Sequence, residues 1–291
     1  MWYPPPVRPL EIHSADKLLA IVRKTRQEWN LPEHKELWFR AEDIKHSATK
    51  LQPKLYRPGK GRARKPVREL LSIEDECHDE FRRCADQLSE NKPEGDADWD
   101  WYFLSQHHGA PTRLLDWSDG ALVALHFAVR NKVTPIKTGG TIYVLDPYWL
   151  LDHIKKSRAY DSTKKNWNQY RRKRKWEGLS KDDWDDTYLP CDRGERRELP
   201  LPAAPLLWDT PQVSRRVAAQ RSRFMIFGSN PEWLSSLLGR RGSRLRAINI
   251  PKENMHAIKY ELRDAGLTES VIFPDLDGLG REIEQKWMDR L

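Results

Sequence analysis

The residues best suited to chemistry gather in one stretch, "LSQHHGAPTRLLDWSDGALVALHFA", residues 104–128. It holds His107, His108, Arg113, Asp116 and Ser118 around a Gly-Ala-Pro-Thr turn. An imidazole can act as a base near neutral pH, a carboxylate can offset a developing positive charge, and a guanidinium can bind an anion. A buried polar group without a partner costs about 1 to 3 kcal/mol, so a joint that only supports a core does not need so many. The stretch predicts a functional site.

A purely structural interpretation of this stretch stays open. Asp116 would pair with Arg113 or Arg40, and Ser118 or Asp119 would cap the helix that starts near residue 120. The first amides of that helix also carry a partial positive charge, which would suit an anionic ligand.

The elements around this stretch follow from periodicity and breakers. Helices are expected over 14–29, from about 67 to 88, and over 120–131, 254–266 and 279–291. Strands are expected over 36–43, 139–147, 223–228, 245–251 and 269–274, with a further short strand after the Gly-Ala-Pro-Thr turn. Strands and helices do not alternate regularly, so we expect an α+β fold with a mixed sheet and surrounding helices.

The second of these helices has an apolar stripe at intervals of three and four residues, which we expect to face the core. Its members are Leu70, Ile73, Cys77, Phe81, Cys84 and Leu88. The three cysteines, Cys77, Cys84 and Cys191, lack metal-ligand spacing, and we expect buried, reduced thiols.

Positive charge is concentrated in residues 155–176, "KKSRAYDSTKKNWNQYRRKRKW". Ten lysines and arginines against one aspartate give this segment a charge of +9. Because the whole chain carries +8, the remaining residues together carry −1. Interleaved aromatic residues (Tyr160, Trp167, Tyr170 and Trp176) suit contact with nucleic acid or another polyanion. The alternative is a solvated insertion whose charges pair with the acidic segment that follows it.

No apolar run reaches the roughly 20 residues that span a bilayer, and the N-terminus does not resemble a signal peptide. We therefore expect a cytoplasmic protein without membrane contact. Motifs for Rossmann, P-loop or zincin sites are absent, and no metal is expected.

Four motifs together resemble the FRG domain, a bacterial family. They are "WFRAED" (38–43), "SQHHGAPTRLLDWSDGALVALHFA" (105–128), "VAAQRSRFMIFG" (217–228) and "VIFPDLDGLGREI" (271–283). Ala41 stands where the family has the glycine of its name, and Ser222 stands where a glycine is expected. The resemblance runs from about residue 31 to the C-terminus apart from an insertion at about 150–205, so we expect an FRG-like domain over 31–291. A proline-rich N-terminal arm and a helix, over 1–30, are expected to precede it.

The order of elements is similar to the ADP-ribosyltransferase scaffold. This similarity implies that NAD is a substrate and that a sheet of that type forms the core. It assigns catalytic roles to His107, Asp116 and Gln220, where Gln220 stands in the position of the usual glutamate. It assigns cofactor binding to five further residues: Arg40, Glu42, His108, Arg113 and Ser118. The three regions near residues 40, 107–116 and 220 should then meet around one hollow.

Under this resemblance the acceptor is a protein or a nucleic acid, and the chain serves as a toxin or phage-defence effector controlled by an antitoxin or another partner protein. Two other functions stay open. One is a non-catalytic module that binds a nucleotide or nucleic acid, and the other is a metal-independent nuclease that uses histidine as acid and base.

Overall fold

The computed structural model describes residues 10–43, 48–59, 61–85, 88, 93, 98–130, 138–173, 183–190, 200–208 and 215–288. The predicted proline-rich arm, Cys191, Trp176 and most of the acidic segment after residue 180 lie outside these residues.

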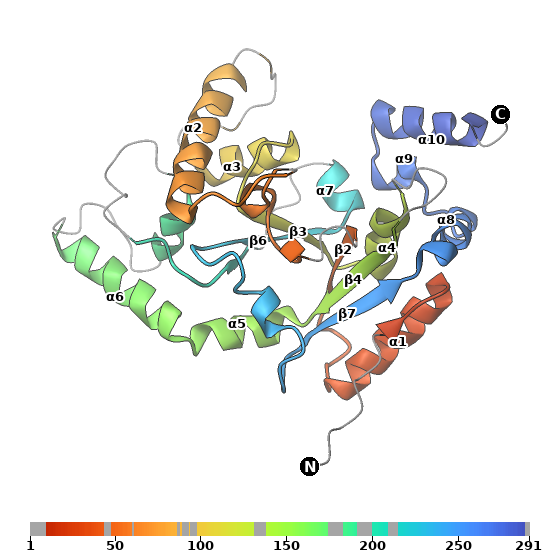
Figure 1. The fold of residues 1–291 in the computed structure, drawn as a ribbon, viewed down its shortest axis with the longest axis horizontal. Helices are drawn as coiled ribbons and strands as arrows, with labels where there is room; N and C mark the ends of the chain where they lie inside the picture. Colours follow the sequence, from red (N-terminus) through yellow and green to blue (C-terminus); the bar gives the residue numbers. More distant parts are fainter. Residues whose placement is uncertain are drawn as a thin grey trace.

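A seven-stranded mixed sheet forms the centre of the described structure (Figure 1). Its strand order is β1-β7-β4-β2-β3-β6-β5, and only the edge pair β1 with β7 is parallel. The strands are β1 (Leu10–Glu11), β2 (Trp38–Asp43), β3 (Leu114–Ser118), β4 (Gly140–Leu145), β5 (Leu206–Trp208), β6 (Ser222–Ile226) and β7 (Leu245–Ile250). The predicted α+β class with a mixed sheet is confirmed, and β1 and β5 are additions that the sequence pattern did not predict.

Helices surround the sheet. They are α1 (Ala15–Glu28), α2 (Val67–Ala85), α3 (Asp98–His107), α4 (Ala121–Val129), α5 (Pro147–Lys155), α6 (Arg158–Lys173), α7 (Arg215–Ala219), α8 (Met255–Asp264), α9 (Glu269–Ile272) and α10 (Leu276–Met288). No described helix combines the length and the apolar character that crossing a bilayer requires.

The two faces of the sheet pack against different helices. Side chains of β2, β4 and β7 that include Phe39, Ile142 and Ile248 form one core with α1, α4 and α8, which lie together at one end of the sheet in Figure 1. Helix α3 covers the far end of the same face, because Leu114 and Phe224 pack with its aromatic residues. Residues of opposite parity form the core of the second face.

The pairing between β2 and β3 is the shortest in the sheet. These two strands share one register position, Phe39 with Ser118, whereas β2 pairs with β4 over six positions. Beyond that single position, the Arg40 guanidinium bridges the two strands, and its NH1 donates a hydrogen bond to the Asp116 carbonyl at 2.6 Å.

Helix α1 forms as predicted because its ends are specified locally. The Ser14 hydroxyl accepts a hydrogen bond from the Lys17 amide, and Leu18, Ile21 and Thr25 turn into the core. The helix thus packs into the same core as β2, β4 and β7.

The predicted apolar stripe of α2 is wrong for most of its length. Leu70 is buried, but Cys84 is exposed, Cys77 is half-buried, and Leu88, beyond the helix end, is 86% exposed. The buried positions are instead Leu70, Glu74, His78 and Ala85. The reason is that Glu74 pairs with the buried Arg113, so Glu74 must face the core. The buried face of the helix is therefore rotated by about one residue from the predicted stripe. The expected burial of these two thiols is therefore also wrong.

Residues 269–274 were expected to form a strand, and the structure has helix α9 there. The helical spacing of three places Glu269 and Ile272 on one buried face. Glu269 is held there by Arg130, just after α4, and by Arg281 of α10, so tertiary contacts override the β-propensity of the local sequence.

Candidate functional site

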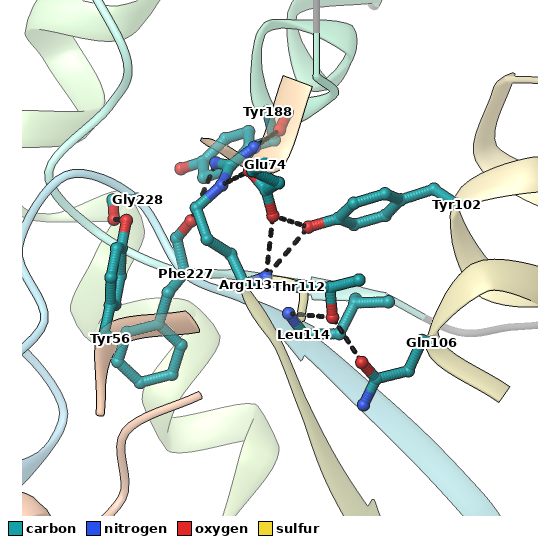
Figure 2. A network of polar contacts seen from close by, with 10 residues as sticks. All are labelled: Tyr56, Glu74, Tyr102, Gln106, Thr112, Arg113, Leu114, Tyr188, Phe227 and Gly228. Carbon is teal, nitrogen blue, oxygen red and sulfur yellow. Dashed lines mark hydrogen bonds and ion pairs between the residues drawn. The ribbon is translucent and has the colours of Figure 1, made fainter. Parts of the chain in front are cut away.

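A buried ion pair holds the start of β3 in place (Figure 2). The Arg113 Nε donates to the Glu74 carboxylate, and their side chains are 2% and 1% exposed. The Arg113 guanidinium also donates to the carbonyls of Phe227, at 3.1 Å, and Tyr188. The Tyr102 hydroxyl donates to Glu74 as well, so α2, α3, β3 and the chain after β6 meet here.

The electrostatics of the pair are those of a permanently charged structural group. Burial alone would lower the pKa of Arg113, but Glu74, followed by Tyr102 and Tyr56, outweighs it and raises that pKa above its ordinary value. The prediction that Arg113 contacts a nucleotide is therefore corrected. Its donors are directed at protein groups inside the core, so it stabilises the fold.

We name the Arg113–Glu74 ion pair, together with Tyr102, the hub. A second chain of hydrogen bonds starts beside it, at Thr112, and runs to Asp116 (Figure 2 shows its first part). The Thr112 hydroxyl donates to the Gln106 side-chain oxygen and accepts from the Leu114 amide at 3.3 Å. The Gln106 Nε2 then donates to both carboxylate oxygens of Asp116 at 3.2 Å. Asp116 itself is exposed, so Gln106 fixes a carboxylate that remains accessible to a ligand.

Ser118 also has a structural position. Its hydroxyl donates to the Gln220 carbonyl at 2.7 Å and accepts from the Gly120 amide at 3.0 Å. Helix α4 has Gly120 as its N-cap with no side-chain cap, so neither Ser118 nor Asp119 caps it as expected.

The predicted catalytic residues lie on the face that α3 and α7 flank. His107 ends α3 and is exposed, and Gln220 follows α7, where its Nε2 donates to the Ile272 carbonyl at 3.4 Å. Partial burial of the ring, followed by the charges of Arg216 and His108, lowers the pKa of His107, although Asp275 opposes this shift. His107 is therefore uncharged near neutral pH.

Arg216, which the sequence reasoning missed, connects these residues. Its charge contributes to the lowered pKa of His107, and the Asp116 carboxylate is close enough to act on the pKa of Arg216. Its guanidinium lies 4.7 Å from the centre of the Phe273 ring. Within the described part of the chain, it makes no hydrogen bond or ion pair. Its place one helical turn before Gln220 was the available signal.

Two more arginines face the same ring. Arg130 lies 3.9 Å and Arg281 lies 5.1 Å from the Phe273 centre. Both pair with Glu269, and the His126 Nε2 lies 3.1 Å from that carboxylate. Burial of Arg216, together with the like charges of these two arginines, lowers the pKa of Arg216 despite nearby Asp275. Arg216 is thus the member of this group whose charge is not compensated by a direct pair.

The predicted single hollow is wrong for Arg40 and Glu42. Because Phe39 is directly opposite Ser118, Asp116 points to the face of Phe39, whereas Arg40 and Glu42 point to the other face. The three chain regions do meet, as the Arg40 bond to the Asp116 carbonyl shows, but their side chains divide between the two faces.

His108 makes its main ring contact with α2 and not with the side chains around Asp116 or Arg40. Its ring stacks on Phe81 of α2, with centres 6.3 Å apart, and meets His107 edge to face at 5.1 Å. No cluster of three or more His, Cys, Asp or Glu side chains suited to a metal occurs among the described residues.

The basic segment is helical from Arg158 to Lys173, and its aromatic residues are used internally. Trp167 is 2% exposed and stacks on Tyr170 at 5.7 Å, while Tyr160 packs against Trp184. Trp167 is therefore not free to stack on a base, whereas Tyr160 and Tyr170 are half-buried. The cations differ, because six are exposed: Lys155, Lys156, Arg158, Lys165, Arg172 and Lys173.

Comparison with known proteins gives one result. No curated protein and no solved structure matches the chain. A family model described as FRG domain matches residues 35–135, which span β2, α2, α3, β3 and α4 and so include His107, Asp116 and the Arg113–Glu74 pair. The match covers about a third of the chain, and it supports assignment of this segment to the FRG domain family.

Proposed function

We propose that the protein is an ADP-ribosyltransferase-like enzyme that binds NAD on the surface formed by His107, Asp116, Arg216 and Gln220. The observation that carries this proposal is the grouping of a neutral imidazole, a fixed carboxylate and an uncompensated guanidinium. We name this group the α3–α7 surface.

Each group has a role that suits cleavage of the bond between nicotinamide and ribose. Arg216 offers charge-assisted hydrogen bonds to the pyrophosphate and so takes over part of the cofactor binding that the resemblance assigns to Arg40. As the bond breaks, nicotinamide leaves with the bonding electrons and the ribose becomes an oxocarbenium-like cation. The Asp116 carboxylate offsets this charge, and the Gln220 amide binds a ribose hydroxyl.

The acceptor completes the reaction. Its nucleophilic atom forms a bond to the ribose carbon and transfers its proton to His107, which the lowered pKa keeps in the basic form near pH 7. The six exposed cations of residues 155–173 can neutralise phosphates, so they favour a nucleic acid over a protein as the acceptor.

The test combines binding and chemistry in the whole chain. NAD should raise the melting temperature, and incubation should release nicotinamide and label an acceptor. Arg216→Gln should weaken NAD binding on the order of tenfold or more, since a hydrogen bond to a charged group contributes about 1.5 to 3 kcal/mol. Arg215→Gln is the matched control, because Arg215 is exposed on the same short helix.

Asp116→Asn should leave NAD binding nearly unchanged and abolish nicotinamide release. If NAD binds in an Arg216-dependent way without any nicotinamide release, the transferase proposal fails and the non-catalytic nucleotide module replaces it. If NAD neither binds nor reacts, both are rejected.

A further inference from the structure

A second polar cluster lies on the opposite face of the sheet. Arg40 and Glu42 are two residues apart on β2 and so share a face with Tyr143, which is directly opposite Arg40 on β4. Arg57 follows the short 3-10 helix at Lys54–Tyr56 and reaches the same carboxylate. The Glu42 Oε1 accepts from the Arg40 Nε at 3.0 Å and from the Arg57 NH2 at 2.5 Å.

Glu42 is fully engaged by these contacts. Its second oxygen accepts from the Leu51 amide at 2.9 Å, and its side chain is 1% exposed. Among the residues that the structure describes, two guanidinium groups therefore share one carboxylate, so one positive charge of the cluster has no carboxylate partner there. The side chains of Arg40 and Arg57 are 16% and 18% exposed, so this charge is largely removed from water.

Two buried donors beside this charge lack a partner. The Trp117 Nε1 and the Arg57 Nε are both buried and have no hydrogen-bond acceptor in the part of the chain that the structure describes. Trp117 is 3% exposed and lies on β3, the strand next to Arg40. A buried donor without an acceptor costs about 1 to 3 kcal/mol, and folded proteins rarely leave one unpaired.

The neighbouring tryptophan shows the contrast. The Trp38 ring lies 6.5 Å from the Trp117 ring in the same core, but its Nε1 donates to the Glu36 carboxylate at 2.8 Å. Both indole rings are buried in the same core, but only the Trp38 Nε1 has an acceptor among the described residues. The unpaired donor is therefore specific to the surroundings of Trp117.

The other groups in the cluster are donors too. Burial, followed by the charge of Glu42, raises the pKa of Tyr143, so its phenol stays protonated. Burial also lowers the pKa of Arg57, and the like charge of Arg40 adds to this effect although Glu42 opposes it. A bound anion would relieve this unfavourable state.

We propose that Arg40, Arg57, Trp117 and Tyr143 form a binding site for a phosphoryl oxyanion. The donors come from β2, β3, β4 and the chain after the 3-10 helix, and the three strand residues share one face of the sheet. Donors on four separate segments suit a tetrahedral oxyanion, which accepts hydrogen bonds from several directions, better than a planar carboxylate. The site is independent of the proposed function, because it lies on the opposite face of the sheet from the Asp116 carboxylate.

The experiment titrates the whole chain, labelled with ¹⁵N at the indole nitrogens, with inorganic phosphate. Trp117→Phe identifies the Trp117 indole signal by its loss. In the unchanged protein, phosphate should shift that signal and raise the melting temperature. Trp117→Phe should weaken phosphate binding about tenfold or more, as expected for loss of one hydrogen bond to a charged group.

Three controls make the result specific. Trp38→Phe removes an indole whose donor is already paired and should leave phosphate binding unchanged. Arg57→Lys keeps the charge opposite Glu42 but removes the Nε donor, so it should weaken binding even if Trp117→Phe does not fold. Arg216→Gln should affect NAD and not phosphate, which separates this site from the α3–α7 surface.

The proposal is overturned if phosphate leaves the Trp117 signal unchanged, or if Trp117→Phe and Trp38→Phe bind phosphate equally. Tighter binding of acetate than of phosphate would also overturn it, since the site would then be one for a carboxylate.

Discussion

Removal of Arg113 should be among the most destabilising single substitutions in the chain. The Arg113→Met variant leaves the Glu74 carboxylate buried without its cation, and loss of one partner of a buried pair costs about 3 to 5 kcal/mol. It also removes the donor to the Phe227 and Tyr188 carbonyls. We expect a loss near the upper end of that range, against a total stability of about 5 to 15 kcal/mol for a typical domain.

The double variant Glu74→Leu/Arg113→Met tests the reasoning. It removes both charges together, so it should retain more stability than Arg113→Met alone, although the two carbonyls still lose their donor. Arg113→Lys should fall between the unchanged protein and Arg113→Met, because an ammonium keeps the charge but not the fork of donors. Urea unfolding followed by tryptophan fluorescence measures each free energy.

A matched control lies on the same helix. Glu69 pairs with Lys65 at the exposed start of α2, and Glu69→Gln should change the free energy of unfolding by less than about 1 kcal/mol. The single variant Glu74→Leu completes the comparison. If the stability lost in the double variant equals the sum of the losses in Glu74→Leu and Arg113→Met, the two residues act independently and our account of the ion pair is wrong.

Four other substitutions have clear expected outcomes. Burial would raise the pKa of Glu269, but hydrogen bonds led by His126 lower it to about 2 from an ordinary 4.5, so its contribution of about 3 kcal/mol is present above pH 4.5 and is lost toward pH 2. Unfolding free energies of the unchanged protein and Glu269→Gln should therefore converge on acidification, and parallel pH profiles would contradict this. In helix α10, Gly278→Ala should destabilise by about 1 to 3 kcal/mol because its Cβ would lie 2.0 Å from the Phe273 carbonyl oxygen. Gly280→Ala meets nothing within 4 Å and should be neutral or stabilise by up to about 1 kcal/mol in the same thermal melts, so equal losses would refute the steric argument. Ser14→Ala should cost about 1 kcal/mol by loss of the α1 cap, and an unchanged melting temperature would show that the cap is dispensable.

The sequence predicts those elements whose signals are local. Helix α1 has a capping serine and a helical apolar pattern, and β4 has a β-branched run between glycine and proline, so neighbours in the chain specify both. Helix α9 has no such signal. Its helical state depends on Glu269 meeting Arg130 and Arg281, and that meeting exists only after the fold has formed.

The candidate site follows the same division. The stretch around Asp116 is identifiable from its residue types, but the face to which each side chain points depends on strand register. A register that pairs Phe39 with Ser118 places Arg40 and Asp116 on opposite faces, and a shift of one residue would have placed them together. Likewise, Glu74 was hidden within an apolar pattern because its partner Arg113 lies on another element.

The single register position between β2 and β3 has a consequence for local opening. The backbone ladder contributes little to the joint there, so side chains such as Arg40 hold together one part with four strands and another with three. Amide hydrogens along the β2–β3 seam should exchange with solvent deuterium through small fluctuations, whereas those in the six-position β4–β7 pairing should exchange only when the whole domain unfolds. The sheet is thus one unit in its connectivity but two units in its resistance to opening.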